Sequence, residues 1–115
     1  MTLSKIEIQE LQTKYSYLTN YEAVEPDAPI NPLTYIDSNG DALLHLAAQQ
    51  SDVHTVRLLL TAGIDVNLIG DMGNTGLHYA QTEEMARLLL SYGASVDARN
   101  EFGNRPAWTL SGAPT

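Results

Sequence analysis

The sequence predicts an all-α fold in which helix-turn-helix units stack into a solenoid, with β-hairpin or loop fingers protruding between the units. First, residues 40–47 match residues 73–80, and the glycines and histidines of the two segments lie 33 positions apart. Second, residues 56–63 match residues 86–93 at an offset of 30 positions, and each segment contains three consecutive leucines. Third, a further unit begins at residue 103. Units repeated at this spacing bury their apolar faces against each other.

The composition describes one globular domain of 115 residues. Hydrophobic residues make up 43% of the chain and charged residues 17%, which is typical of a folded protein. There is no cysteine, so a disulfide framework and a thiolate metal site are excluded. The first residues lack the apolar region of a signal peptide, and no apolar run approaches the roughly 18 residues of a membrane helix. We therefore expect a cytoplasmic protein.

The net charge of −8 indicates the kind of partner. Residues 1–41 contain seven acidic and two basic residues, and residues 42–115 contain seven acidic and four basic residues. Nucleic acid and anionic membranes both require a basic surface, so neither is expected as a partner. Electrostatics favours a basic protein or peptide, although an acidic excess is also typical of an ordinary solvated surface.

An N-terminal segment, residues 1–20, is expected to cap the stack. Ser4 and Glu7 form a capping-box pattern, and the residues after them predict an amphipathic helix over 4–19. Its apolar stripe has helical spacing and consists of Ile8, Leu11, Tyr15 and Leu18. Residues 21–36 form an ordered, non-helical connector, because they contain Pro26, Pro29 and Pro32.

The first repeat, residues 37–69, contains two predicted helices. The first spans about 42–50 and is rich in alanine and leucine. The second begins after Asp52, a good N-cap, and has apolar residues at helical spacing. Gly63 follows as a left-handed residue that ends the helix. A ten-residue connection from Gly63 to Gly73 is too long for a tight helix hairpin, so we expect a projecting loop or short hairpin.

The second repeat, residues 70–99, is shortened by three residues between its apolar segments. Thr82 caps its second helix, and Gly93 ends that helix as Gly63 does in the first repeat.

Residues 100–115 form a partial repeat that caps the C-terminal end. We expect Pro106 to open a last helical turn. Trp108 and Leu110 would then pack against the leucines 88–90, and residues 111–115 would be a frayed tail.

These units resemble the ankyrin repeat. Residues 37–48 follow the family pattern Asp-x-x-Gly-x-Thr-Pro-Leu-His-x-Ala-Ala, and residues 63–67 follow Gly-Ala-Asp-Val-Asn. The resemblance covers residues 36–110. It has departures that weaken local capping without contradicting the fold. Ala42 and Leu43 replace Thr-Pro, Gly76 replaces proline, Gly70 and Asn100 replace the finger aspartate, and Trp108 replaces a histidine.

No residue pattern predicts catalysis, a cofactor or a metal site. The resemblance implies that His45 and His78 hydrogen-bond neighbouring loop backbone. His54 is expected to be exposed on a helix and has no second ligand four residues on. We therefore expect no enzyme, and a small hydrolase using His54 with Asp52 is the least favoured class. The motifs of phosphate loops, zinc sites and nucleophile elbows are absent from the sequence.

The resemblance implies a module that binds a protein partner through its finger loops and concave face. Met72 and Phe102 occupy the same finger position and would be apolar anchors, unless the two tips fold back and pack on each other. Position by position, the candidate protein-binding residues are Ile36, Ser38, Asn39, Asp41, Gln49, Gln50, Ile69, Asp71, Met72, Asn74, Arg99, Glu101, Phe102 and Asn104.

Two other functions stay open. A narrower form of the binding function is a toxin-neutralising immunity protein or inhibitor that masks a basic enzyme with its acidic face. The second is a self-associating structural protein, because the C-terminal end would expose an apolar edge around Leu89, Trp108 and Leu110. The chain is thus expected to be a monomer or a weak homodimer through this end.

Overall fold

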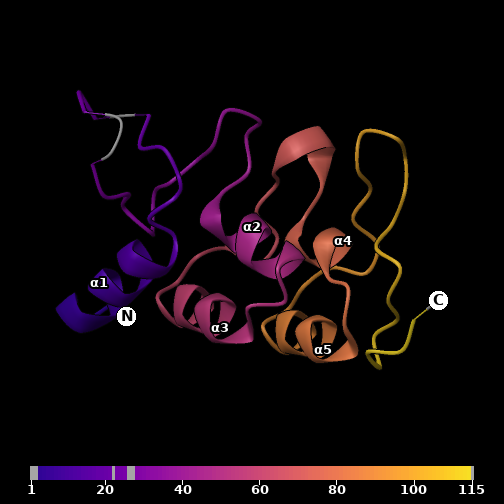
Figure 1. The fold of residues 1–115 in the computed structure, drawn as a ribbon. Coiled ribbons are helices and arrows are strands. Elements are labelled where there is room, and N and C mark those ends of the chain that lie inside the picture. Colours follow the sequence, from indigo (N-terminus) through magenta and orange to yellow (C-terminus); the bar gives the residue numbers. More distant parts are fainter. Residues whose placement is uncertain (1–2, 22, 26–27, 115) are drawn as a thin grey trace.

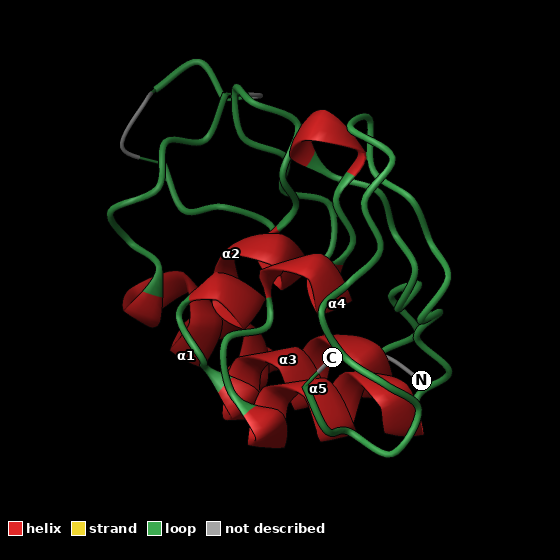
Figure 2. Cartoon of the chain, turned by 90° about the vertical axis from the view of Figure 1, so that its right-hand side faces the viewer, coloured by secondary structure: helices red, strands yellow, loops and turns green. Residues whose placement is uncertain are grey.

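The computed structural model describes residues 3–21, 23–25 and 28–114. Helices form two rows in these residues, and three loops rise from one row as fingers (Figure 1). The row beside the fingers consists of α2 (Leu43–Gln49) and α4 (Gly76–Tyr79), and the outer row consists of α3 (Val53–Thr61) and α5 (Glu83–Ser91). Figure 2 shows the α-helices on one side of the molecule and the fingers on the other, where the second finger contains the short 3-10 helix η1 (Asp71–Gly73). The predicted stack of helix pairs with protruding fingers is confirmed.

The N-terminal helix α1 (Lys5–Lys14) lies at the end of the stack beside α3. The predicted capping box is present, since the Glu7 amide donates to Ser4 Oγ at 3.1 Å and the Ser4 amide donates to Glu7 Oε1 at 2.9 Å. The predicted extent of 4–19 is wrong, because the helix ends at Lys14 and residues 15–18 form turns. Tyr15 leaves the helical conformation and turns its hydroxyl to Asp52, 2.8 Å away.

The connector is non-helical over its described residues 21, 23–25 and 28–36, as predicted. Pro26, one of the three prolines on which that prediction rests, lies outside the described residues.

Both predicted caps of the outer helices are confirmed. Asp52 accepts a hydrogen bond from the Thr55 amide, and Thr82 accepts one from the Met85 amide, each at 3.2 Å. At the other ends, Gly63 and Gly93 have φ values of +99° and +92°. Glycine adopts this left-handed conformation without a steric penalty. In this conformation the amides of each glycine and of the residue after it donate hydrogen bonds to carbonyl groups in the last turn of the helix.

The core lies between the two rows and consists mainly of leucine, alanine and valine. The leucines at 59 and 89 are almost fully buried, with 1% and 0% of their surface exposed. Ala47 and Ala48 on α2 are 0% exposed, so this helix approaches its neighbours closely. Leu11 and Tyr15 extend the same core under α1, which covers the N-terminal end.

The C-terminal segment differs from the prediction. Residues 106–110 form no helical turn, and residues 111–114 are not frayed. Instead Trp108 pairs with Pro114 in an antiparallel bridge, and the Thr109 amide donates to the Ala113 carbonyl at 2.8 Å. Gly112, with φ at +84°, permits the tight turn between them. This closed turn replaces the helix that Pro106 was expected to open.

Candidate functional site

Three fingers of equal length form the face opposite the outer helices. They comprise residues 36–42, 69–75 and 99–105, and each is closed by a backbone hydrogen bond across its base. The amides of Asp37, Gly70 and Asn100 donate to the carbonyl four residues later at 2.8, 2.8 and 3.0 Å. The repeat in the sequence thus becomes a repeat in space, with equivalent positions placed side by side along the stack (Figure 1).

The first and third fingers are organised by a side chain of their own. Asp37 Oδ1 accepts hydrogen bonds from the amides of Asn39 and Asp41, both at 2.9 Å. Asn100 Oδ1 accepts equivalent bonds from Phe102 and Asn104, both at 3.0 Å. A side-chain acceptor that binds backbone two residues ahead is the usual stabiliser of such turns.

The second finger has glycine at this position and uses an acceptor from its neighbour. Asp41 Oδ1, on the first finger, accepts the amide of Asp71 at 2.8 Å and the hydroxyl of Tyr79 at 2.9 Å. Burial raises the pKa of Tyr79, and the hydrogen bond to the Asp41 carboxylate raises it further, so this hydroxyl stays a donor. A Cβ on Gly70 would lie 2.4 Å from Asp41 Oδ1, so the glycine makes room for this carboxylate.

The two equivalent histidines join each inner helix to the next finger, as the family resemblance implies. His45 Nδ1 accepts the Ala42 amide at 2.9 Å, and Nε2 lies 2.8 Å from the Leu68 carbonyl. His78 repeats the pattern with the Thr75 amide at 3.0 Å and the Asn104 carbonyl at 2.9 Å. A neutral imidazole with its proton on Nε2 satisfies both partners.

The second and third fingers are also bonded directly to each other. The Glu101 amide donates to the Met72 carbonyl at 2.9 Å, and Asn100 Nδ2 donates to Asn74 Oδ1 at 2.9 Å. Every finger is therefore bonded to its neighbour, and the three form one continuous, hydrogen-bonded surface. Such preorganisation lowers the entropy that a binding surface loses when a partner docks.

The candidate residues fall into three groups. The structure brings nine of them together as exposed positions on the fingers, which we name the finger face: Ile36, Ser38, Asn39, Ile69, Met72, Arg99, Glu101, Phe102 and Asn104. Asp71 and Asn74 are half-buried between fingers, and Asp41 is buried at 5% exposure. Gln49 and Gln50 lie at the C-terminal end of α2, about 10 Å along the helix from its finger end.

The apolar side chains of the finger face are exposed. Ile69 and Phe102 expose 67% and 68% of their surface, and Ile36 and Met72 about half. Neither Met72 nor Phe102 is therefore buried, whereas the alternative in which the two tips pack on each other stays a prediction. Met72 also has a left-handed backbone, with φ at +56°, which is unusual for a residue with a side chain.

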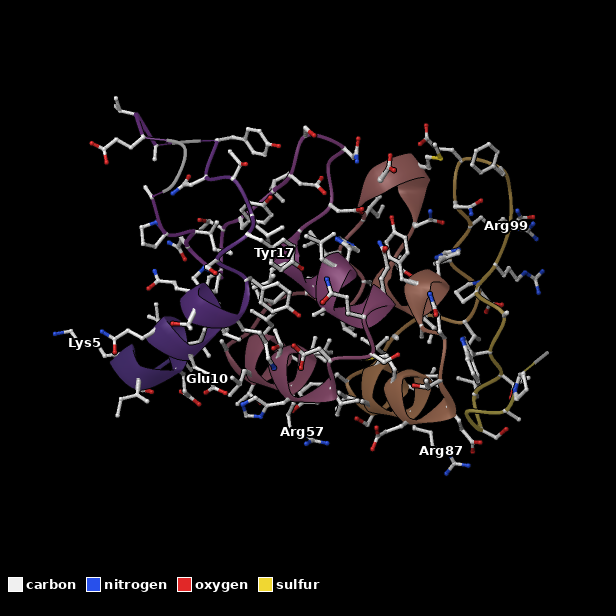
Figure 3. All side chains as sticks on the ribbon, viewed as in Figure 1. Lys5, Glu10, Tyr17, Arg57, Arg87 and Arg99 are labelled. Atoms are coloured by element: carbon white, nitrogen blue, oxygen red, sulfur yellow. The ribbon has the colours of Figure 1, made fainter. Side chains whose placement is uncertain are left out.

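Charge is distributed unevenly around this face. Arg57 is the one basic residue between positions 15 and 85, a stretch with ten acidic residues. Figure 3 shows Lys5, Arg57 and Arg87 on the helical side, whereas Arg99 lies on the third finger. The first two fingers thus combine exposed isoleucine and methionine with aspartates and no basic residue.

Hydrogen bonds to Asp52 attach α1 to the rest of the stack. Asp52 lies within 3.1 Å of Lys14 Nζ, 2.8 Å of the Tyr15 hydroxyl and 2.6 Å of Thr55 Oγ1. Desolvation acts to raise the pKa of Asp52, but hydrogen bonds from Thr55, Tyr15 and Lys14 outweigh it, and the pKa lies below its usual range. Sequence reasoning identified Asp52 as a cap and missed the contacts with Lys14 and Tyr15, which no local pattern signals.

The described residues contain neither a metal-ligand cluster nor a membrane-spanning helix. No group of three or more histidine, aspartate or glutamate side chains within residues 3–21, 23–25 and 28–114 is placed to hold a metal ion. Over the same residues, no helix has the length and apolar character needed to cross a membrane.

The helix pairs stack side by side, and the exposed fingers between them repeat and are joined by hydrogen bonds. This architecture defines a repeat protein. The family model for ankyrin repeats, in three copies, matches residues 16–100. The chain belongs to the ankyrin-repeat family.

Several curated proteins share this sequence pattern. Human protein phosphatase 1 regulatory subunit 27 is 36% identical over 78 residues, which are 65% of this chain and 51% of that protein. Human neurogenic locus notch homolog protein 4 is 36% identical over 106 residues, 87% of this chain but 5% of that protein. The Drosophila melanogaster nuclear factor NF-kappa-B p110 subunit is 45% identical over 49 residues, 43% of this chain and 5% of that protein. The chain thus spans about half of the first of these relatives and about a twentieth of the other two.

Proposed function

We propose that this chain is a non-enzymatic binding module that holds a basic protein partner on its finger face. Ankyrin repeats mediate protein–protein interaction, and the observation that supports this surface is the row of exposed apolar side chains on bonded fingers. Exposed apolar residues on a rigid support are typical of contact surfaces. A regulatory subunit among the relatives agrees with a role in binding.

The charge of the chain supports a basic partner. On the finger face, Arg99 and Glu101 balance each other. The negative charge therefore comes from the half-buried Asp37 and Asp71 of the first two fingers and from the net charge of −8 over the whole chain. An anionic surface of this kind speeds the approach of a cationic partner, and salt screens the effect. The apolar tips then supply the short-range contacts. A cytoplasmic setting is part of this proposal and stays a prediction.

Differential capture from a lysate of the source cells tests the proposal. The bait is the purified chain, the finger variant has Met72→Ala and Phe102→Ala, and the control variant has Ile6→Ala and Tyr92→Ala. The control removes two apolar side chains that are also exposed, at 77% and 42%, but lie on helix α1 and at the end of α5. We expect a basic protein to bind the unaltered chain and the control but not the finger variant. Equal capture by all three would contradict the proposal.

Inhibition of a basic enzyme is the narrower form of this function, and the acidity of the chain favours it. It differs in one result, because the activity of the captured enzyme would then fall as the complex forms. A captured enzyme that keeps its full activity in the complex would leave a binding module without an inhibitory role.

A further inference from the structure

The C-terminal end of the stack has a second surface, which meets the finger face at Asn104. An open cleft of about 750 Å³ lies there, and its apolar lining includes Val96, Pro106 and Trp108. Asp97 and Arg105 stand at the same cleft, 3.8 Å apart, and remain 79% and 55% exposed. The cleft therefore combines an apolar lining with one acidic and one basic group.

An exposed apolar side chain, Leu110, stands at the rim of this cleft and contributes to its lining. Leu110 lies in the closed turn between Trp108 and Pro114 and exposes 78% of its surface. It was expected to pack on the leucines of α5, but the turn directs it outward instead. Leu89 and Trp108, named with it as an apolar edge, are buried at 0% and 9% exposure. Leu110 is thus an exposed apolar side chain at the rim of the apolar cleft that it helps to line.

An exposed apolar side chain and an apolar cleft on one face make that face complementary to itself. Two copies related by a two-fold axis can then each insert Leu110 into the cleft of the other, which is the usual geometry of a homodimer. Asp97 and Arg105 add one charge of each sign to this face, so neither copy meets a face of uniform charge.

The distribution of charge favours residues 86–115 over the rest of the chain taken together. Residues 86–115 contain three basic and two acidic residues, for a net charge of +1. Residues 1–85 contain three basic and twelve acidic residues, for a net charge of −9. Two copies therefore repel each other through most of their surface and least through the C-terminal end.

We propose that the C-terminal end is a self-association surface, on which a second copy of this chain docks by two-fold symmetry through Leu110 and the cleft beside Trp108. This surface adjoins the third finger through Asn104 and Arg105 but does not include the apolar tips Met72 and Phe102, so the dimer leaves those tips free. The two proposals can fail independently of each other.

Sedimentation equilibrium from about 5 to about 500 µM tests this inference, with Leu110→Glu as the variant and Ile6→Glu as its control. The two side chains are 78% and 77% exposed and lie at opposite ends of the stack, and both substitutions add one negative charge. We expect the unaltered chain and Ile6→Glu to reach a dimer, and Leu110→Glu to weaken it at least about tenfold. A monomer at every concentration, growth beyond a dimer, or a dimer that survives Leu110→Glu would each overturn the proposal.

Fluorescence provides a second measurement that locates the contact. The chain has one tryptophan, Trp108, and it lines the cleft. Quenching of Trp108 by acrylamide should decrease as the concentration of the unaltered chain rises, and should stay constant for Leu110→Glu. Dimer formation without any change in quenching would place the contact elsewhere and overturn the proposal.

Discussion

The Oδ1 atom of Asp41 accepts a hydrogen bond from the Asp71 amide, 2.8 Å away on the next finger. The first and third fingers each contain a side-chain acceptor, at Asp37 and Asn100, but the second has Gly70 in that place. The neighbouring carboxylate thus supplies the missing acceptor and joins two fingers. Asp41, which the sequence suggested as a contact for the partner, is a buried support of the face.

Replacing Asp41 should destabilise the fold. Asp41→Ala leaves the Asp71 amide and the Tyr79 hydroxyl without their acceptor, so we expect a loss of about 2–4 kcal/mol in the free energy of unfolding. Denaturant unfolding measures the loss. Compared with the unaltered chain, Asp41→Ala should increase amide hydrogen exchange most in residues 69–75. Asp97→Ala is the control, since Asp97 is exposed and its loss should change stability by less than about 0.5 kcal/mol. Equal effects of the two substitutions would refute the role of Asp41.

Gly70 and Asp41 should be energetically coupled. The Cβ of Gly70→Ala would lie 2.4 Å from Asp41 Oδ1 and 2.9 Å from the His45 ring, so we expect destabilisation of about 1–3 kcal/mol. In the Asp41→Ala background the closest clash is gone, and the same substitution should cost less. A double-mutant cycle measures this coupling. Additive effects of the two substitutions would contradict the close contact.

The contribution of Asp52 to stability should depend on pH. Its folded pKa is below the unfolded value, so its stabilisation is complete above about pH 4 and is lost as the pH falls through the folded pKa. Asp52→Asn keeps a helix cap but removes the charge. We expect it to lower the free energy of unfolding by about 1–2 kcal/mol at neutral pH. The difference from the unaltered chain should shrink below about pH 4, and a constant difference across that range would be inconsistent with the lowered pKa.

Met72 should show opposite effects on stability and binding. Its left-handed backbone strains any residue with a Cβ, so Met72→Gly relieves strain while it removes the side chain. We expect the melting temperature to stay level or rise while affinity for the captured partner falls. Asn39→Gly, at the equivalent tip of the first finger, lacks this strain and should cost about 0.5–1 kcal/mol. A loss of stability in Met72→Gly as large as that in Asn39→Gly would show that the strain has no energetic weight.

The helices could be predicted from the sequence because local signals determine them. Asp52 and Thr82 cap the outer helices, Gly63 and Gly93 end them, and the repeat aligns equivalent residues without any knowledge of the structure. Where tertiary contacts decide, prediction fails. Tyr15 ends α1 early because it bonds to Asp52, 37 positions away, and no helical spacing reveals that contact.

The candidate site was only partly predictable for the same reason. Repeat alignment identified the exposed tips correctly, including Met72 and Phe102. It could not distinguish the buried Asp41 from its exposed equivalent Asn104, because the difference depends on what the next finger contains. Gly70 was the available signal, since a finger without its own acceptor requires one from a neighbour. Leu110 was misplaced because the bridge between Trp108 and Pro114 depends on a turn that the repeat pattern does not include.

A hydrogen-exchange footprint of the complex with the captured partner tests the central claim most directly. We predict that binding slows amide exchange in all three fingers, residues 36–42, 69–75 and 99–105, and leaves the outer helices α3 and α5 unchanged. Slower exchange confined to α3, α5 or α1, with no change in the fingers, would contradict the account.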